Sequence, residues 1–143
     1  MVEVVGRTGE QELIDEVREV TLLQSPEVRP YRAATIEIKE IALVDIKPTT
    51  LYVLRQNLVF QRELRDALET QGLDPLNLRG ALTLRSTDGT VGLIPPLIEV
   101  DPGHGPCLFD GAHRTYIGRE AGRKVIRAIV IEGADESYPL YAY

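Results

Sequence analysis

Apolar residues recur three or four positions apart in two stretches of the chain, which is the spacing of amphipathic helices. The first stretch predicts a helix over about residues 9–22, and Thr8-Gly9-Glu10-Gln11 has the spacing of a capping box at its start. The second predicts a helix from a capping Asn57 to about Gln71, ended by Gly72. The apolar positions of the two stripes are Leu13, Ile14, Val17 and Val20, then Leu58, Leu64, Ala67 and Leu68.

Alternating apolar and polar residues predict strands in other parts of the chain. One strand is expected near 33–39 and another near 41–46, or a single long strand with a bulge. Alternation on both sides of Asp88-Gly89 predicts a hairpin within 76–94. A last strand is expected over 125–130.

The strongest candidate for a functional site in the sequence is a tight turn between a strand and a helix. Cys107-Leu108-Phe109 is expected to be a short buried strand, Asp110-Gly111 a turn, and about 113–121 a helix closed by Gly122. The first N–H groups of a helix have no internal partner and lie at the positive end of its dipole. His113 and Arg114 beside them predict an anion site, with phosphate as the favoured ligand. The alternative is that Asp110 only caps the helix and Arg114 is a surface cation.

Composition narrows the class of protein. The chain has 143 residues, enough for one domain with a core, and a single cysteine, Cys107, so no internal disulfide is possible. No apolar run is long enough to cross a membrane and the N-terminus lacks a signal-peptide pattern, so a cytoplasmic protein is expected. The net charge is −6 and no basic run occurs, so nucleic acid is not expected as a partner.

Several segments together resemble the ParB/sulfiredoxin superfamily. They are the strand Pro96–Val100, the DGxHR motif at Asp110–Arg114 followed by Gly122, and the strand at 125–130. A further segment, residues 46–50, is similar to the IxPTQ motif of ParB-like kinase and nuclease relatives. The resemblance covers roughly residues 41–131.

The resemblance implies an α/β fold, α+β in layout, with a small mixed sheet and packed helices. A single ParB/sulfiredoxin-like domain is expected to fill 1–143, with a core at 31–131. Residues 1–30 would be an added helical extension and the 76–94 hairpin an insertion. Residues 132–143 form a tyrosine-rich tail expected to pack on an apolar surface.

In that superfamily the loop before this helix binds nucleotide phosphates. Carried over to this chain, the resemblance assigns phosphate binding to Gly111, Ala112, His113, Arg114 and Thr115. It assigns catalytic roles to Asp110 and His113, and further nucleotide contacts to Pro96, Thr49 and Thr50. The implied ligands are ATP or another nucleoside triphosphate and Mg²⁺. No set of side chains has the spacing of a metal cage. The resemblance implies that Asp110 is the residue that could contact Mg²⁺. Arg119 or Arg123, one or two turns along, could reach the same anion or only lie on the helix surface.

Departures from the superfamily motifs decide between activities. Sulfiredoxins carry their nucleophilic cysteine where this chain has Ala112, and Cys107 is expected to be buried and inert, so that activity is not expected. Free serine kinases have a glutamate after PTQ, whereas residues 51–56 contain no acid. Partition proteins have a GERR motif and downstream DNA-binding domains that this sequence lacks. Asp45 and Glu99 are expected to serve strand-end solvation and pairing.

The sequence therefore predicts a nucleotide-binding protein, an ATP-dependent phosphotransferase or nucleoside triphosphate hydrolase acting on a small-molecule acceptor. The alternative is a non-catalytic nucleotide-sensing or protein-interaction module. A ParB-like nuclease is a third possibility, and a homo-oligomer is compatible with all three.

Overall fold

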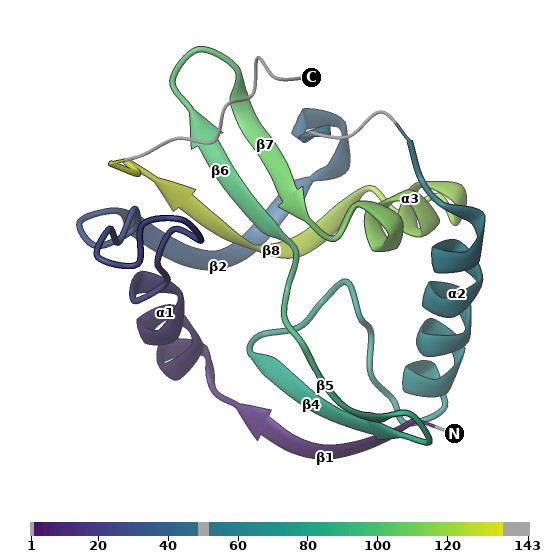
Figure 1. Cartoon of the computed structure of the whole chain (residues 1–143). Helices are drawn as coiled ribbons and strands as arrows, with labels where there is room; N and C mark the ends of the chain where they lie inside the picture. Colours follow the sequence, from purple (N-terminus) through teal and green to yellow (C-terminus); the bar gives the residue numbers. More distant parts are fainter. Residues whose placement is uncertain (1, 49–51, 136–143) are drawn as a thin grey trace.

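A computed structural model of the chain describes residues 2–48 and 52–135, which form two sheets and three α-helices (Figure 1). The larger sheet has the strand order β2-β8-β6-β7-β3, and the smaller one β1-β4-β5. This confirms the predicted mixed α+β fold class. The strands are β1 (Glu3–Thr8), β2 (Thr35–Ala42), β3 (Lys47–Pro48), β4 (Ala81–Ser86), β5 (Gly89–Leu93), β6 (Leu97–Asp101), β7 (Gly105–Asp110) and β8 (Val125–Glu132). The helices are α1 (Glu10–Arg18), α2 (Arg55–Glu69) and α3 (Ala112–Glu120).

The larger sheet is buried on both faces around its inner strand β8. Strand β8 pairs antiparallel with β2 and parallel with β6. Successive side chains of a strand point to opposite faces. Ile129 and Ile131 therefore pack with α1 residues such as Leu13, while Ala128 and Val130 pack with a second cluster on the other face. A strand covered on both faces needs a nearly continuous apolar run, which is what the last predicted strand shows.

The predicted hairpin is confirmed as β4 and β5, joined where Ser86 pairs with Gly89. Its apolar face, with Leu82 and Leu84, packs on Leu64 and Leu68 of α2. Figure 1 shows α2 running from the level of α3 down to this smaller sheet. The amphipathic pattern of α2 thus packs this helix on the smaller sheet.

A strand at the N-terminus was not predicted. Residues 3–8 form β1, which pairs antiparallel with β4 and turns the hairpin into a three-stranded sheet. The capping-box interpretation of Thr8 was wrong, because Thr8 belongs to this strand and pairs with Ala81. Helix α1 instead begins after Gly9, with no side-chain cap, and ends at Arg18 rather than near residue 22.

The other boundaries shift by a few residues. Strand β2 runs without a bulge to Ala42 and is followed by a 3₁₀ turn at Leu43–Asp45, so neither predicted arrangement of 33–46 is correct. Helix α2 begins at Arg55, with Leu54 rather than Asn57 at the N-cap position. In the described part of the chain, no helix is long and apolar enough to span a membrane.

Candidate functional site

The predicted turn joins β7 to α3 through Gly111. Gly111 has φ +99°, a left-handed conformation that favours glycine, and an added Cβ would lie 3.1 Å from Cβ of Pro96. No side chain caps α3, and the first intrahelical bond runs from Thr115 N–H to the Gly111 carbonyl at 2.9 Å. Within the described residues, the N–H groups of Ala112, His113 and Arg114 have no acceptor. These three N–H groups lie where the sequence predicted an anion site.

A cavity of about 310 Å³ opens beside these donors. We call it the turn pocket; its lining residues are Gln61, Gly92–Ile94 and Phe109–Arg114. Three elements build it, since Gln61 comes from α2, Gly92–Ile94 from the end of β5 and the loop after it, and the rest from the turn. The turn is therefore open to a ligand and is not blocked by the smaller sheet.

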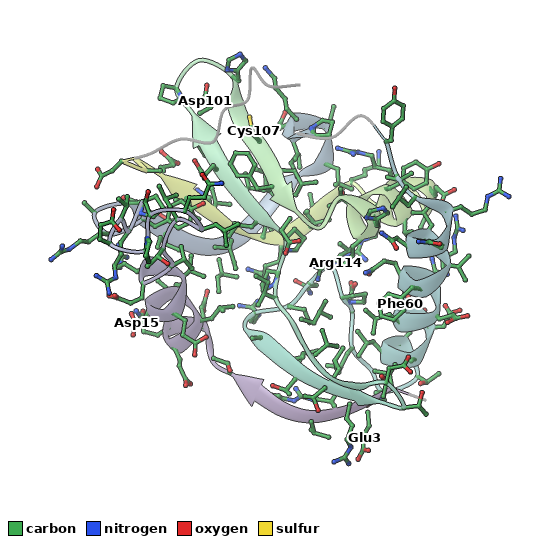
Figure 2. All side chains as sticks on the ribbon, viewed as in Figure 1. Glu3, Asp15, Phe60, Asp101, Cys107 and Arg114 are labelled. Atoms are coloured by element: carbon green, nitrogen blue, oxygen red, sulfur yellow. The ribbon has the colours of Figure 1, made fainter. Side chains whose placement is uncertain are left out.

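Arg114 is the buried cation of the site. Only 7% of its surface is exposed, and its Nη1 donates to the Pro75 carbonyl at 3.1 Å. Figure 2 shows it between the end of β7 and the smaller sheet, at the level of α2. Burial lowers the pKa of Arg114 to about 10, while the negative charge of Asp110 acts in the opposite direction. At neutral pH the guanidinium is therefore still charged, and no carboxylate of the described residues forms an ion pair with it.

His113 links the first turn of α3 to the first turn of α2. Its Nε2 accepts a hydrogen bond of 3.0 Å from the backbone N–H of Leu54, the N-cap residue of α2. The neutral ring then carries its proton on Nδ1. In this arrangement His113 offers a donor at Nδ1, whereas the lone pair needed for a general base is already used.

The remaining predicted residues divide into three groups. Asp110 is exposed at the rim of the turn pocket, where a carboxylate is accessible to ligand or solvent. Thr115 and Pro96 do not line this pocket: Thr115 is 1% exposed and bonds the Ala112 carbonyl at 3.0 Å, while the buried Pro96 supports Gly111. The Thr115 hydroxyl therefore has a hydrogen-bond partner within its own helix. Thr49 and Thr50 lie outside the described residues.

Two arginines considered for the same anion have structural partners instead. Arg119 donates to the carbonyls of Leu43 and Ile46 at 3.1 and 3.4 Å, which stabilises the 3₁₀ turn. Arg123 forms an ion pair of 2.9 Å with Asp74. Neither lines the turn pocket.

Sequence reasoning missed Gln61 as a lining residue. A signal for it existed, because Gln61 is a polar residue three positions after Leu58 on the predicted apolar stripe of α2. The contact of Leu54 with His113 and that of Pro75 with Arg114 had no sequence signal, since both use backbone groups far away in the chain.

Other reactive groups lie elsewhere. Cys107 is buried, as predicted. It lies toward the end of the β6–β7 hairpin that points away from the turn at Gly111 (Figure 2). Burial, followed by the nearby charge of Asp101, raises the pKa of its thiol, so it is largely protonated at neutral pH. Among residues 2–48 and 52–135, no group of three or more histidine, cysteine or carboxylate side chains is arranged to hold a metal ion.

Comparison with known proteins places the chain in a family. A search of curated proteins gave no match. A family model, by contrast, matches residues 12–143, a span that includes the larger sheet, the turn and all three helices except the first two residues of α1. The chain belongs to the ParB CE domain family.

Proposed function

We propose that this protein binds the phosphate groups of a nucleoside triphosphate in the turn pocket. The observation that supports this most directly is the set of free N–H groups at Ala112, His113 and Arg114, which open on a cavity beside a buried guanidinium. Each oxygen of a phosphate accepts hydrogen bonds, and charge-assisted bonds are roughly twice as strong as neutral ones. Membership of the ParB family adds support, because the resemblance implies phosphate binding at this loop.

Burial makes Arg114 a better phosphate ligand than an exposed arginine. It has been removed from water already in the free protein, as its lowered pKa indicates, so an anion beside it regains electrostatic stabilisation without further desolvation of this group. The guanidinium has five N–H donors, and in the described structure the Pro75 carbonyl is its one hydrogen-bond acceptor. The Nδ1–H of His113 adds a donor on the same turn.

For the reaction we propose transfer of the terminal phosphoryl group to a small hydroxyl compound or to water, with Asp110 accepting the proton of the attacking hydroxyl. Asp110 is the one carboxylate among the lining residues of the turn pocket. Mg²⁺ is commonly bound by one or two carboxylates together with substrate phosphates, and Asp110 fits that requirement. When bound, Mg²⁺ would neutralise charge on the phosphates.

Thermal-shift and calorimetric titrations with ATP, ADP, CTP and GTP, with and without Mg²⁺, test binding, because a ligand of the native state raises Tm. The decisive variant is Arg114→Lys, which keeps a charge and a donor for Pro75 but loses the fork that binds two oxygens at once. Its matched control is Arg119→Lys on the same helix, where the guanidinium also binds carbonyls but does not line the turn pocket. Both variants are expected to lose some stability, and only Arg114→Lys is expected to lose the nucleotide-induced shift. An unchanged shift in Arg114→Lys would place the nucleotide elsewhere.

Turnover is tested separately with Asp110→Asn, which removes the charge at an exposed position. Loss of phosphate release or transfer with retained nucleotide binding is the expected result. Retained turnover would exclude Asp110 as the base.

A second candidate is a nucleotide sensor that binds without turnover. It is favoured by the hydrogen bond from Leu54 to His113, which leaves Asp110 as the sole candidate base at the turn. If the wild-type protein binds nucleotide and shows no turnover with water or with any hydroxyl compound supplied, this function replaces the catalytic one.

A further inference from the structure

A second cavity, lined by residues of α2 and α3, also includes Arg114. This interhelix pocket has a volume of about 180 Å³ and shares Arg114 and Gln61 with the turn pocket. The two pockets are therefore neighbours. The buried guanidinium therefore lines two sites, and the turn pocket accounts for only one of them.

The floor of the interhelix pocket is apolar. It consists of Pro75, Leu76, Ile117 and Gly118. Gly118 permits this close packing, because an added Cβ would lie only 2.6 Å from Cδ1 of Leu76. An Asp74 oxygen accepts from the Leu76 N–H at 3.0 Å, which stabilises the loop that carries Pro75.

The charges of the pocket favour an anion. Three of its lining residues are arginines, Arg65, Arg114 and Arg123, and two are acids, Glu69 and Asp74. Arg123 and Asp74 neutralise each other at 2.9 Å. At the mouth, Arg65 forms an ion pair of 3.2 Å with Asp66, whereas Arg114 has no carboxylate partner among the described residues.

We infer that the interhelix pocket binds a second small ligand, one that carries a single anionic group on a short apolar body. The anionic group lies against Arg114 and the apolar part against Leu76 and Ile117. The volume is below the roughly 300–1,000 Å³ of sites for drug-sized ligands, so the ligand has few non-hydrogen atoms. This inference does not depend on nucleotide binding in the turn pocket. If both ligands bind, each contacts the guanidinium of Arg114.

The test is an NMR titration of the ¹⁵N-labelled full chain with butyrate, propylphosphonate and the neutral butyramide. Saturable shifts of the Leu76, Ile117 and Gly118 amides by an anion, and weaker or no shifts with butyramide, are expected. The two anions distinguish a carboxylate from a phosphate-like group as the preferred head. Shifts confined to Gly111–His113, equal shifts with butyramide, or no saturable shift with any probe would overturn the inference.

Substitutions at the exposed Ala121 and the half-buried Arg65 make the test specific without disturbing the core. Ala121→Leu fills the mouth of the pocket and is expected to abolish the shifts. Arg65→Gln removes a charge at the mouth and should raise the anion Kd about threefold. Its control is Arg62→Gln, one turn away on α2, whose guanidinium pairs with Glu120 at 2.7 Å and does not line the pocket. Equal Kd values for the two arginine variants, or unchanged binding in Ala121→Leu, would contradict the assignment. A nucleotide titration of the same sample reports on Gly111–Arg114, so failure at one pocket is distinguishable from failure at the other.

Discussion

The substitution Tyr31→Phe is predicted to destabilise the protein by an amount that grows with pH. Glu99, in the interior of β6, is only 5% exposed, and its Oε2 accepts a hydrogen bond of 2.6 Å from the Tyr31 hydroxyl. Burial is the largest influence and raises the pKa of Glu99 above its ordinary value of 4.5; the Tyr31 hydrogen bond lowers it, and the charge of Asp101 raises it. Because the folded-state pKa is raised, the contribution of Glu99 to stability is fully present below about 4.5 and declines as pH rises through the folded-state value.

The magnitude follows from the kind of hydrogen bond lost. Below the pKa of Glu99, Tyr31→Phe removes a bond between neutral groups, worth ~0.5–1.5 kcal/mol. Above it, the substitution removes a bond to a buried carboxylate, worth ~1.5–3 kcal/mol. The loss of unfolding free energy should therefore be ~1 kcal/mol larger at high pH than at low pH. Equivalently, the pKa of Glu99 is expected to be higher still in the Tyr31→Phe variant. The free energy of unfolding of this variant therefore falls further than that of the wild type as pH rises.

Urea unfolding followed by far-ultraviolet circular dichroism, at about pH 4 and about pH 8, measures this difference. Tyr116→Phe is the control, because Tyr116 is 39% exposed and its hydroxyl makes no hydrogen bond in the described structure. Glu99→Gln should remove the part of the pH dependence that Glu99 contributes, so that the wild type loses stability relative to this variant as pH rises. An equal loss for Tyr31→Phe at both pH values, or an unchanged pH dependence in Glu99→Gln, would refute the reasoning.

Two further predictions concern packing and reactivity. Gly80→Ala should lower the free energy of unfolding by ~3 kcal/mol, since the new Cβ would lie 2.0 Å from the backbone oxygen of Thr8, which has no rotamer to change. Gly9→Ala is its control, with nothing within 4 Å of the added atom, and a similar loss in both variants by urea unfolding would show that the clash is not the cause. Cys107 should resist iodoacetamide at neutral pH until the protein unfolds, because burial raises the pKa of its thiol; mass spectrometry of the native protein showing rapid alkylation would contradict this.

Glu99 itself shows where sequence reasoning stopped. A glutamate next to apolar residues in a strand was expected to serve strand-end solvation or pairing. It is indeed paired, but deep in the sheet interior and with a tyrosine from the loop before β2, a partner 68 positions away. The strand pattern is local, whereas the partner depends on how the loop crosses the sheet.

At the N-terminal strand, a local sequence pattern led to a wrong prediction. Residues 3–8 contain few apolar side chains, and the capping-box spacing at Thr8 favoured a helix start. Pairing with β4 overrode that local preference, because the backbone of Thr8 gains ladder partners in the three-stranded sheet. Strand propensity depends strongly on such context.

By itself, the sequence determined the period of most elements, the mixed fold class, the hairpin at Asp88-Gly89 and the strand–turn–helix at Gly111. These features depend on interactions between residues close in the chain, which leave a pattern in the sequence. Only the tertiary structure decided that Thr115 bonds its own helix, that His113 accepts from Leu54, and that Arg114 lines two pockets. Such features arise when α2 packs beside α3 and the loop at Pro75 reaches Arg114, and long-range packing of this kind has no local periodicity to reveal it.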